Sequence, residues 1–84
     1  MKTDLKNKIE ELRKEWLNKE ITLWDLDKIT GTDMTGKYDL KRDLMNSETE
    51  GSYDDGEINY EFRFVEGSEI DFEGKVIITD IYAL

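Results

Sequence analysis

The residues of this chain that could do chemistry are carboxylates, and three of them are evenly spaced. Glu69, Asp71 and Glu73 lie two residues apart, which on an extended strand places their side chains on one face, about 6.6 Å apart. Two carboxylates in a cleft could act as acid and base on a glycoside if burial raised the pKa of one of them. A chain of 84 residues has little room for such a cleft. We therefore expect no catalytic residues and no enzymatic activity.

Several other chemistries are excluded by residue types that the chain lacks. It contains no Cys and no His, so Ser-His-Asp and Cys-His arrangements cannot form, and thiolate and imidazole metal ligands are missing. An EF-hand is excluded because Gly51 and Phe62 stand where acidic ligands are required. We expect no metal and no cofactor. Loose binding of Ca²⁺ or Mg²⁺ at Asp54, Asp55 and Glu57 stays open beside their simpler role as solvated turn residues.

The negative charge is concentrated in the second half of the chain. The net charge is −9, and the last 38 residues hold 11 acidic and only 2 basic side chains. Such a surface repels nucleic acid and attracts a basic protein surface, with fast and salt-sensitive association. We expect the partner to be a basic, nucleic-acid-binding protein, with no direct contact to nucleic acid. The candidate partner-binding residues are Asp54, Asp55, Glu57, Glu61, Glu66, Glu69, Asp71 and Glu73.

Trp24 is a candidate of another kind. It could serve as an exposed aromatic anchor for a partner, since Leu23 and Leu26 can fill the inward face of the same short helix. Packing in the hydrophobic core is the alternative role for Trp24, and the sequence favours it.

Small acidic inhibitors of the phage and mobile-element type, which act as mimics of DNA, are similar to this chain in size and charge. The similarity implies a non-enzymatic inhibitor that blocks a basic nucleic-acid-binding protein. It is an analogy of size and charge and rests on no motif. The simpler alternative is that the acidic strands only confer solubility and discourage aggregation at the sheet edges.

Two further functions stay open. Three helices followed by a hairpin is the element order of a winged helix-turn-helix regulator, with Lys37, Lys41 and Arg42 on the recognition helix. The acidic wing opposes this function, because DNA phosphates would repel it. The other function is a homodimeric structural module, joined through the apolar segment that runs from Val76 to Leu84.

The first half of the chain carries helical patterns. Apolar residues spaced three or four apart predict a helix over residues 3–19. Thr22 and Asp25 form a capping-box pattern for a second helix over residues 23–30, which Gly31 ends. Residues 37–46 favour a third helix, although the same residues also fit a strand.

The second half carries strand patterns. Residues 57–65 alternate, with Ile58, Tyr60, Phe62 and Phe64 pointing inward. Residues 69–73 alternate again, with Ile70 and Phe72 inward and the three carboxylates outward. Residues 76–84 are apolar on both faces except at Thr79 and Asp80, and they predict a central strand or a self-association edge.

Together these elements predict a single α+β domain over residues 1–84, with a helical part at about 3–46 and an acidic β-meander at about 47–84. Two to three N-terminal helices should pack on one face of a three- or four-stranded antiparallel meander. The N-terminus lacks an apolar stretch of signal-peptide or membrane-span type. We therefore expect a cytoplasmic location, in the cell or in an infected host, and no membrane partner.

Overall fold

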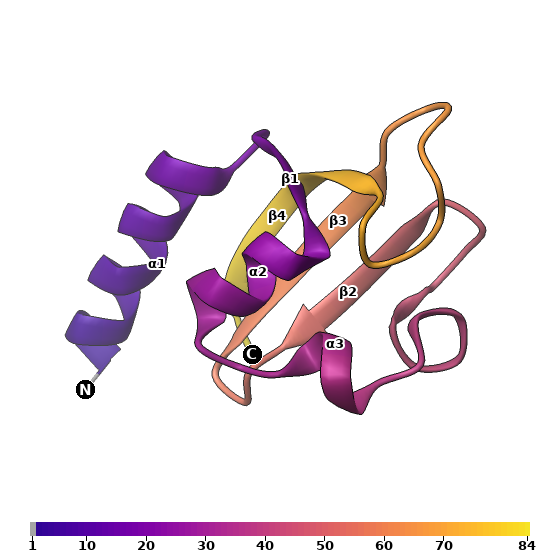
Figure 1. Cartoon of the computed structure of the whole chain (residues 1–84). Coiled ribbons are helices and arrows are strands. Elements are labelled where there is room, and N and C mark those ends of the chain that lie inside the picture. The colour runs from indigo at the N-terminus through magenta and orange to yellow at the C-terminus, as the bar shows by residue number, and fades with distance from the viewer. Residues whose placement is uncertain (1) are drawn as a thin grey trace.

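An antiparallel sheet and the helices that precede it build an α+β structure, as the sequence predicts (Figure 1). The structure is a computed structural model that describes residues 2–84. The elements in chain order are α1 (Lys2–Trp16), β1 (Glu20–Thr22), α2 (Leu23–Thr30), α3 (Met34–Lys37), the π-helical turn η1 (Leu40–Leu44), β2 (Glu50–Asp54), β3 (Ile58–Phe64) and β4 (Lys75–Ala83).

The sheet has the strand order β1-β4-β3-β2, and all its pairs are antiparallel. Strands β2, β3 and β4 form the predicted meander, while β1 adds to the outer side of β4. The last strand is therefore central, as the apolar pattern of residues 76–84 indicates. A bulge between β3 and β4 leaves Thr79 unpaired, because Glu61 pairs with Asp80 and Phe62 pairs with Ile78.

The hydrophobic core lies on one face of the sheet, under α2 and α3 (Figure 1). Alternate residues of β3 point into it, as predicted, and Val76, Ile78 and Ile81 join them from β4. Helix α2 contributes Leu23 and Leu26. The opposite face of β3 carries polar side chains, so the sheet has one buried and one polar face.

The predicted capping box of α2 is present. The Asp25 amide donates to Thr22 Oγ1 at 3.2 Å, and the Thr22 amide donates to Asp25 Oδ2 at 3.0 Å. Gly31 ends the helix in the left-handed conformation, with φ of 71°. The Asp27 carboxylate then accepts the Met34 amide at 2.9 Å, which joins α2 to α3.

The predicted helix over residues 37–46 forms only in part, as the five-residue π-helical turn η1. Helix α3 ends at Lys37, and Tyr38 and Asp39 are extended before the single turn η1. The Asp39 carboxylate accepts the Arg42 amide at 2.9 Å, so a local side-chain cap begins a new turn instead of continuing α3. The winged-helix hypothesis thus loses the continuous helix that it needs.

The predicted strand over residues 69–73 is wrong, because these residues form a turn-rich loop between β3 and β4. Asp71 Oδ1 accepts the amides of Glu73 at 2.9 Å and Gly74 at 2.8 Å, which folds the chain back on itself. Ile70 and Phe72 still pack inward against the core, as the alternation indicates. Side-chain direction was therefore predicted correctly and backbone conformation was not.

Candidate functional site

Seven of the eight candidate carboxylates lie in two clusters at opposite ends of the sheet, and the eighth, Glu61, lies between them on β3. The first cluster, named the acidic turn, is the β2–β3 connection with Asp54, Asp55 and Glu57. The second, named the acidic loop, is residues 65–74 and carries Glu66, Glu69, Asp71 and Glu73. The seven residues of β3 separate the clusters by about 20 Å. The single continuous acidic face that strand spacing predicted is therefore not formed.

Glu61 lies between the clusters, on the polar face of β3. Its carboxylate accepts a hydrogen bond from the Tyr82 hydroxyl at 2.7 Å. This bond raises the pKa of Tyr82, because loss of the phenolic proton would place a second negative charge beside Glu61. Glu61 is thus held by its neighbouring strand and belongs to neither cluster.

Both carboxylates of the acidic turn that precede Gly56 stabilise the turn itself. Asp54 Oδ2 accepts the Gly56 amide at 3.1 Å. Asp55 Oδ1 accepts the amides of Glu57 at 3.0 Å and Ile58 at 2.9 Å. Such Asx bonds are a sufficient reason for Asp at these two positions. In the acidic loop, Asp71 has the same role.

The acidic loop is closed at its base and ordered within. The Val65 amide donates to the Lys75 carbonyl at 2.9 Å, and the Lys75 amide donates to Ser68 Oγ at 2.7 Å. A first turn is bonded from the Ser68 amide to the Val65 carbonyl at 2.9 Å. A compact loop of this kind presents its side chains from a fixed backbone. Its residues line an open hollow of about 620 Å³.

Gly74 is required by the packing of the acidic loop. A Cβ atom at this position would lie 1.9 Å from the Glu69 carbonyl oxygen and 3.2 Å from the Phe64 ring. The backbone of residue 69 and the backbone of residue 74 approach too closely for any side chain. This contact holds the two halves of the loop together.

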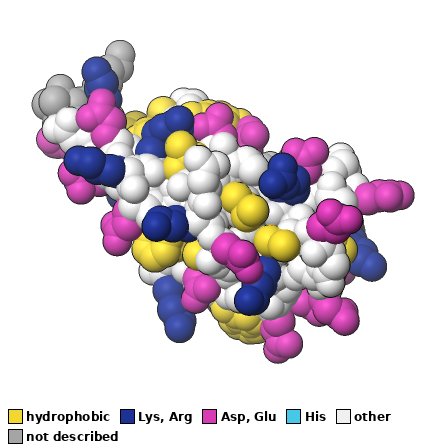
Figure 2. Space-filling view, turned by 90° about the horizontal axis from the view of Figure 1, so that it is seen from above, with side chains coloured by type: hydrophobic (Ala, Val, Ile, Leu, Met, Phe, Trp, Pro, Cys, Tyr) yellow, Lys and Arg dark blue, Asp and Glu magenta, His cyan; other side chains and the backbone are white. Residues whose placement is uncertain are grey.

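Three glutamates of the acidic loop project into solvent without a structural task. Glu66, Glu69 and Glu73 are exposed, and the described part of the chain gives their carboxylates no hydrogen bond and no ion pair. Figure 2 shows the molecule from above, with several carboxylates on the side away from α1 and Lys and Arg side chains among them. These three carboxylates are the ones best placed to meet a partner.

Trp24 lies against the acidic loop. Its ring meets Phe72 edge to face, with a centroid distance of 6.5 Å and an interplanar angle of 65°. Trp24 stays 48% exposed, so the expectation of core packing is wrong and the alternative of an exposed aromatic is correct. Because Phe72 belongs to the acidic loop, the contact places an accessible indole against that loop. The sequence left an exposed Trp24 open and indicated a separate acidic segment, but it did not indicate the contact between them.

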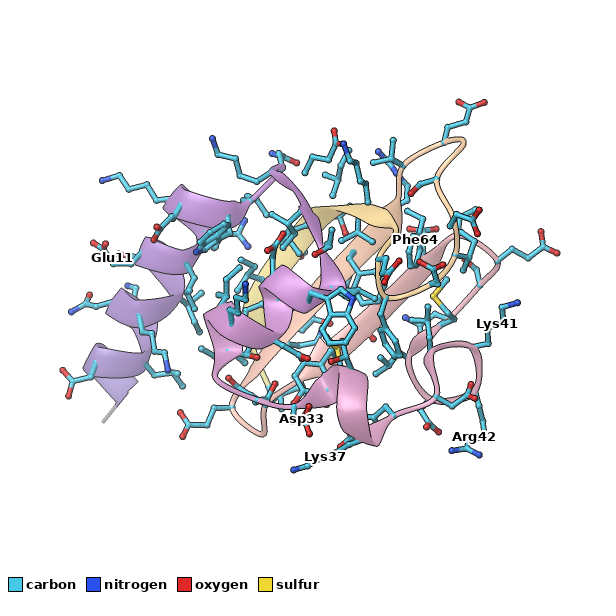
Figure 3. The ribbon with its side chains drawn as sticks, in the orientation of Figure 1. Glu11, Asp33, Lys37, Lys41, Arg42 and Phe64 are labelled. Carbon is cyan, nitrogen blue, oxygen red and sulfur yellow. The ribbon has the colours of Figure 1, made fainter. Side chains whose placement is uncertain are left out.

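The basic residues of the winged-helix hypothesis do not gather on one helix. Lys37 ends α3, whereas Lys41 and Arg42 belong to η1, and all three point away from the molecule (Figure 3). Arg42 Nε donates to Asp43 Oδ1 at 3.0 Å. The same guanidinium lowers the pKa of the Asp43 carboxyl. The positive charge of Arg42 is thus partly neutralised by the neighbouring Asp43 carboxylate.

Residues 2–84 meet the requirements of neither a metal-binding cluster nor a membrane-spanning helix. Their side chains include no group of three or more Asp, Glu, His or Cys arranged to hold a metal ion. Among the same residues, the helices are too short or too polar to cross a bilayer.

Comparisons with protein-family models, with curated proteins and with solved structures find no match.

Proposed function

We propose that this chain is a non-enzymatic protein-binding module that captures a basic, nucleic-acid-binding protein through the acidic loop and Trp24. The observation that carries this proposal is the edge-to-face contact between Trp24 and Phe72. It brings the most exposed aromatic ring of the described residues to the border of the acidic loop. In the proposed complex, Trp24 supplies an apolar contact and the exposed glutamates of the acidic loop supply the negative charge.

This arrangement suits a protein partner. Binding energy at protein interfaces concentrates in a few large side chains, Trp foremost, and a charged rim around them selects the partner and speeds encounter. The acidic loop is held by its own backbone and Ser68 hydrogen bonds, so little conformational entropy is lost when it binds. Solubility alone does not require the glutamates to be held on an ordered loop. The ordered loop and its three unpaired glutamates therefore support a role in partner recognition.

The charge of the chain supports a partner whose natural ligand is nucleic acid. With a net charge of −9, the chain has the same sign of charge as nucleic acid. A basic groove that accepts phosphates would accept the acidic loop and lose access to its nucleic acid. The proposed role is thus inhibition by competition, of the phage or mobile-element type, in the cytoplasm of the cell or host.

Affinity capture with two charge-reversed variants tests the proposal. The test variant carries Glu66→Lys, Glu69→Lys and Glu73→Lys. The control carries Glu10→Lys, Glu11→Lys and Glu15→Lys, which make the same charge change on exposed positions of α1. Wild type and control should retain basic nucleic-acid-binding proteins from host lysate, and added duplex DNA should displace them.

The test variant should retain none of these proteins. Equal capture by the test variant and by wild type would contradict the acidic loop as the binding surface. Capture that duplex DNA does not displace would contradict competition with nucleic acid. Circular dichroism of each variant establishes that the fold is preserved.

A further inference from the structure

The outer edge of β4 is only partly covered by a neighbouring strand. Strand β1 pairs with Lys75, Val76 and Ile77, and the backbone of residues 18 and 19 then bonds to Ile78. No strand of the described chain continues this pairing along the second half of β4. A sheet edge with unpaired N–H and C=O groups is a template for strand addition.

Two residues of this uncovered half direct their backbone groups outward. The Leu84 amide donates to the Glu57 carbonyl, so Leu84 and, two residues earlier, Tyr82 bond to β3. In an antiparallel ladder, the alternate residues Ile81 and Ala83 must then present their N–H and C=O groups to the other side. The outward backbone groups of Ile81 and Ala83 therefore lie on the side of β4 where α1 is.

Side chains satisfy the groups of Ile81. The Ile81 amide donates to Asp80 Oδ1 at 2.9 Å, and Arg13 Nη1 donates to the Ile81 carbonyl at 2.7 Å. The same Arg13 nitrogen pairs with Asp80 Oδ1, which closes the ring of contacts. Arg13 and Asp80 together, named the edge clamp, therefore occupy the place of a neighbouring strand.

Helix α1 carries Arg13 and lies beside β4, whereas α2 lies over the sheet face (Figure 1). Its apolar residues are only partly buried against the core. The helix joins β1 through Asn18, which has a left-handed φ of 64°. Asn tolerates this conformation at a helix end, and the Asn18 amide donates to the Ile78 carbonyl at 2.7 Å. Helix α1 thus covers the edge without being deeply embedded.

We propose that the edge from Ile81 to Leu84 is a pairing site for β4 of a second copy of this chain, and that the edge clamp keeps it closed. A two-fold axis at Tyr82 would place Ile81 of each copy opposite Ala83 of the other. Two such pairs form four N–H···O bonds and extend the sheet across both copies.

The side chains of this segment favour a second copy as the occupant. Tyr82 is 40% exposed and Leu84 is 67% exposed, and self-pairing would cover both. Residues 81–84 carry no charged side chain, and the nearest charged side chain of β4 in this register is Asp80, which lies opposite Leu84 of the other copy. The acidic loop joins β4 at its opposite end, so this site is independent of the proposed partner-binding surface.

Light scattering at two protein concentrations tests the edge site. Wild type should keep a mass near 9.9 kDa at both concentrations, because the clamp is closed. Arg13→Ala should show a mass that rises with concentration toward twice that value. Lys14→Ala is the matched control, since it removes a neighbouring positive charge that makes no contact with the edge, and should stay monomeric.

A second substitution identifies the pairing groups. Ala83→Pro, added to Arg13→Ala, removes an outward N–H that β3 does not use and should restore the monomer. A monomeric Arg13→Ala, or a dimer that Ala83→Pro leaves intact, would overturn the proposal. If Arg13→Ala loses its helical signal, Asp80→Ala gives the same test, because it opens the clamp and leaves α1 chemically intact.

Discussion

Trp24 and Phe72 meet edge to face at a centroid distance of 6.5 Å, although 48 positions separate them in sequence. The contact ties the first turn of α2 to the acidic loop and leaves about half of the indole accessible. Aromatic and carboxylate groups that are distant in the chain thereby share one surface.

Trp24→Ala should weaken binding of the basic partner by at least about 2 kcal/mol, which is roughly a 30-fold loss of affinity, because exposed Trp residues often dominate interface energetics. The fold should survive, since the edge-to-face pair contributes only about 1 kcal/mol beyond its buried area. Tyr38→Ala is the matched control: Tyr38 is similarly exposed, at 43%, but packs on Tyr53, away from the acidic loop. Calorimetric titration of the captured partner measures both, and equal losses would contradict a specific anchor at Trp24.

Local signals in this chain were readable from sequence, and signals that depend on distant residues were not. The capping box of α2 lies within four residues, so propensity and spacing predicted it. The carboxylates of Asp39 and Asp71 accept nearby backbone amides, and turns form where a helix and a strand were predicted. Hydrophobic periodicity does not reveal such side-chain bonds to the backbone. The contact of Trp24 with Phe72 depends on tertiary packing, which no local pattern reveals.

The carboxylates should fall into two groups, one that affects the free energy of unfolding and one that affects partner binding. Asp55→Ala removes the acceptor of two turn amides and should lower the free energy of unfolding by about 1 kcal/mol without changing partner capture. Glu66→Gln, Glu69→Gln and Glu73→Gln together should leave the free energy of unfolding within about 0.5 kcal/mol and weaken capture. Urea unfolding and capture assays on both variants check this division. The opposite pattern would show that the turn carries the binding charge.

Gly74→Ala should destabilise the fold by about 1–3 kcal/mol, because its Cβ would collide with the Glu69 carbonyl, a backbone atom that cannot rotate away. Gly36→Ala is the control, since its Cβ would approach only the flexible Asp33 side chain. It should be neutral within about 0.5 kcal/mol. Urea midpoints measure both, and a stable Gly74→Ala would mean that the two halves of the acidic loop do not pack as described.

Stability should fall at high pH through Tyr60, because burial raises its pKa from 10.0 to about 12. Below pH 10 the Tyr60 hydroxyl is protonated in the folded and the unfolded chain. Its contribution to the free energy of unfolding is then fully present. Between about pH 10 and 12 the unfolded chain releases a proton that the folded chain retains, so stability drops by up to about 1.4 kcal/mol per pH unit. Tyr60→Phe should show a smaller decline in urea titrations across that range, with the remainder due to Tyr82, whose pKa is also raised. Parallel curves for the two proteins would contradict the assignment.

Displacement of duplex DNA from the captured partner tests the central claim most directly. Labelled duplex is bound to that partner at low salt, and the chain is titrated in while fluorescence anisotropy reports the bound fraction. Wild type and the variant with three α1 glutamates reversed should release the duplex, with a potency that falls as salt rises. The variant with Glu66→Lys, Glu69→Lys and Glu73→Lys should release none. Equal release by that variant, or no release by wild type at any salt concentration, would contradict the account.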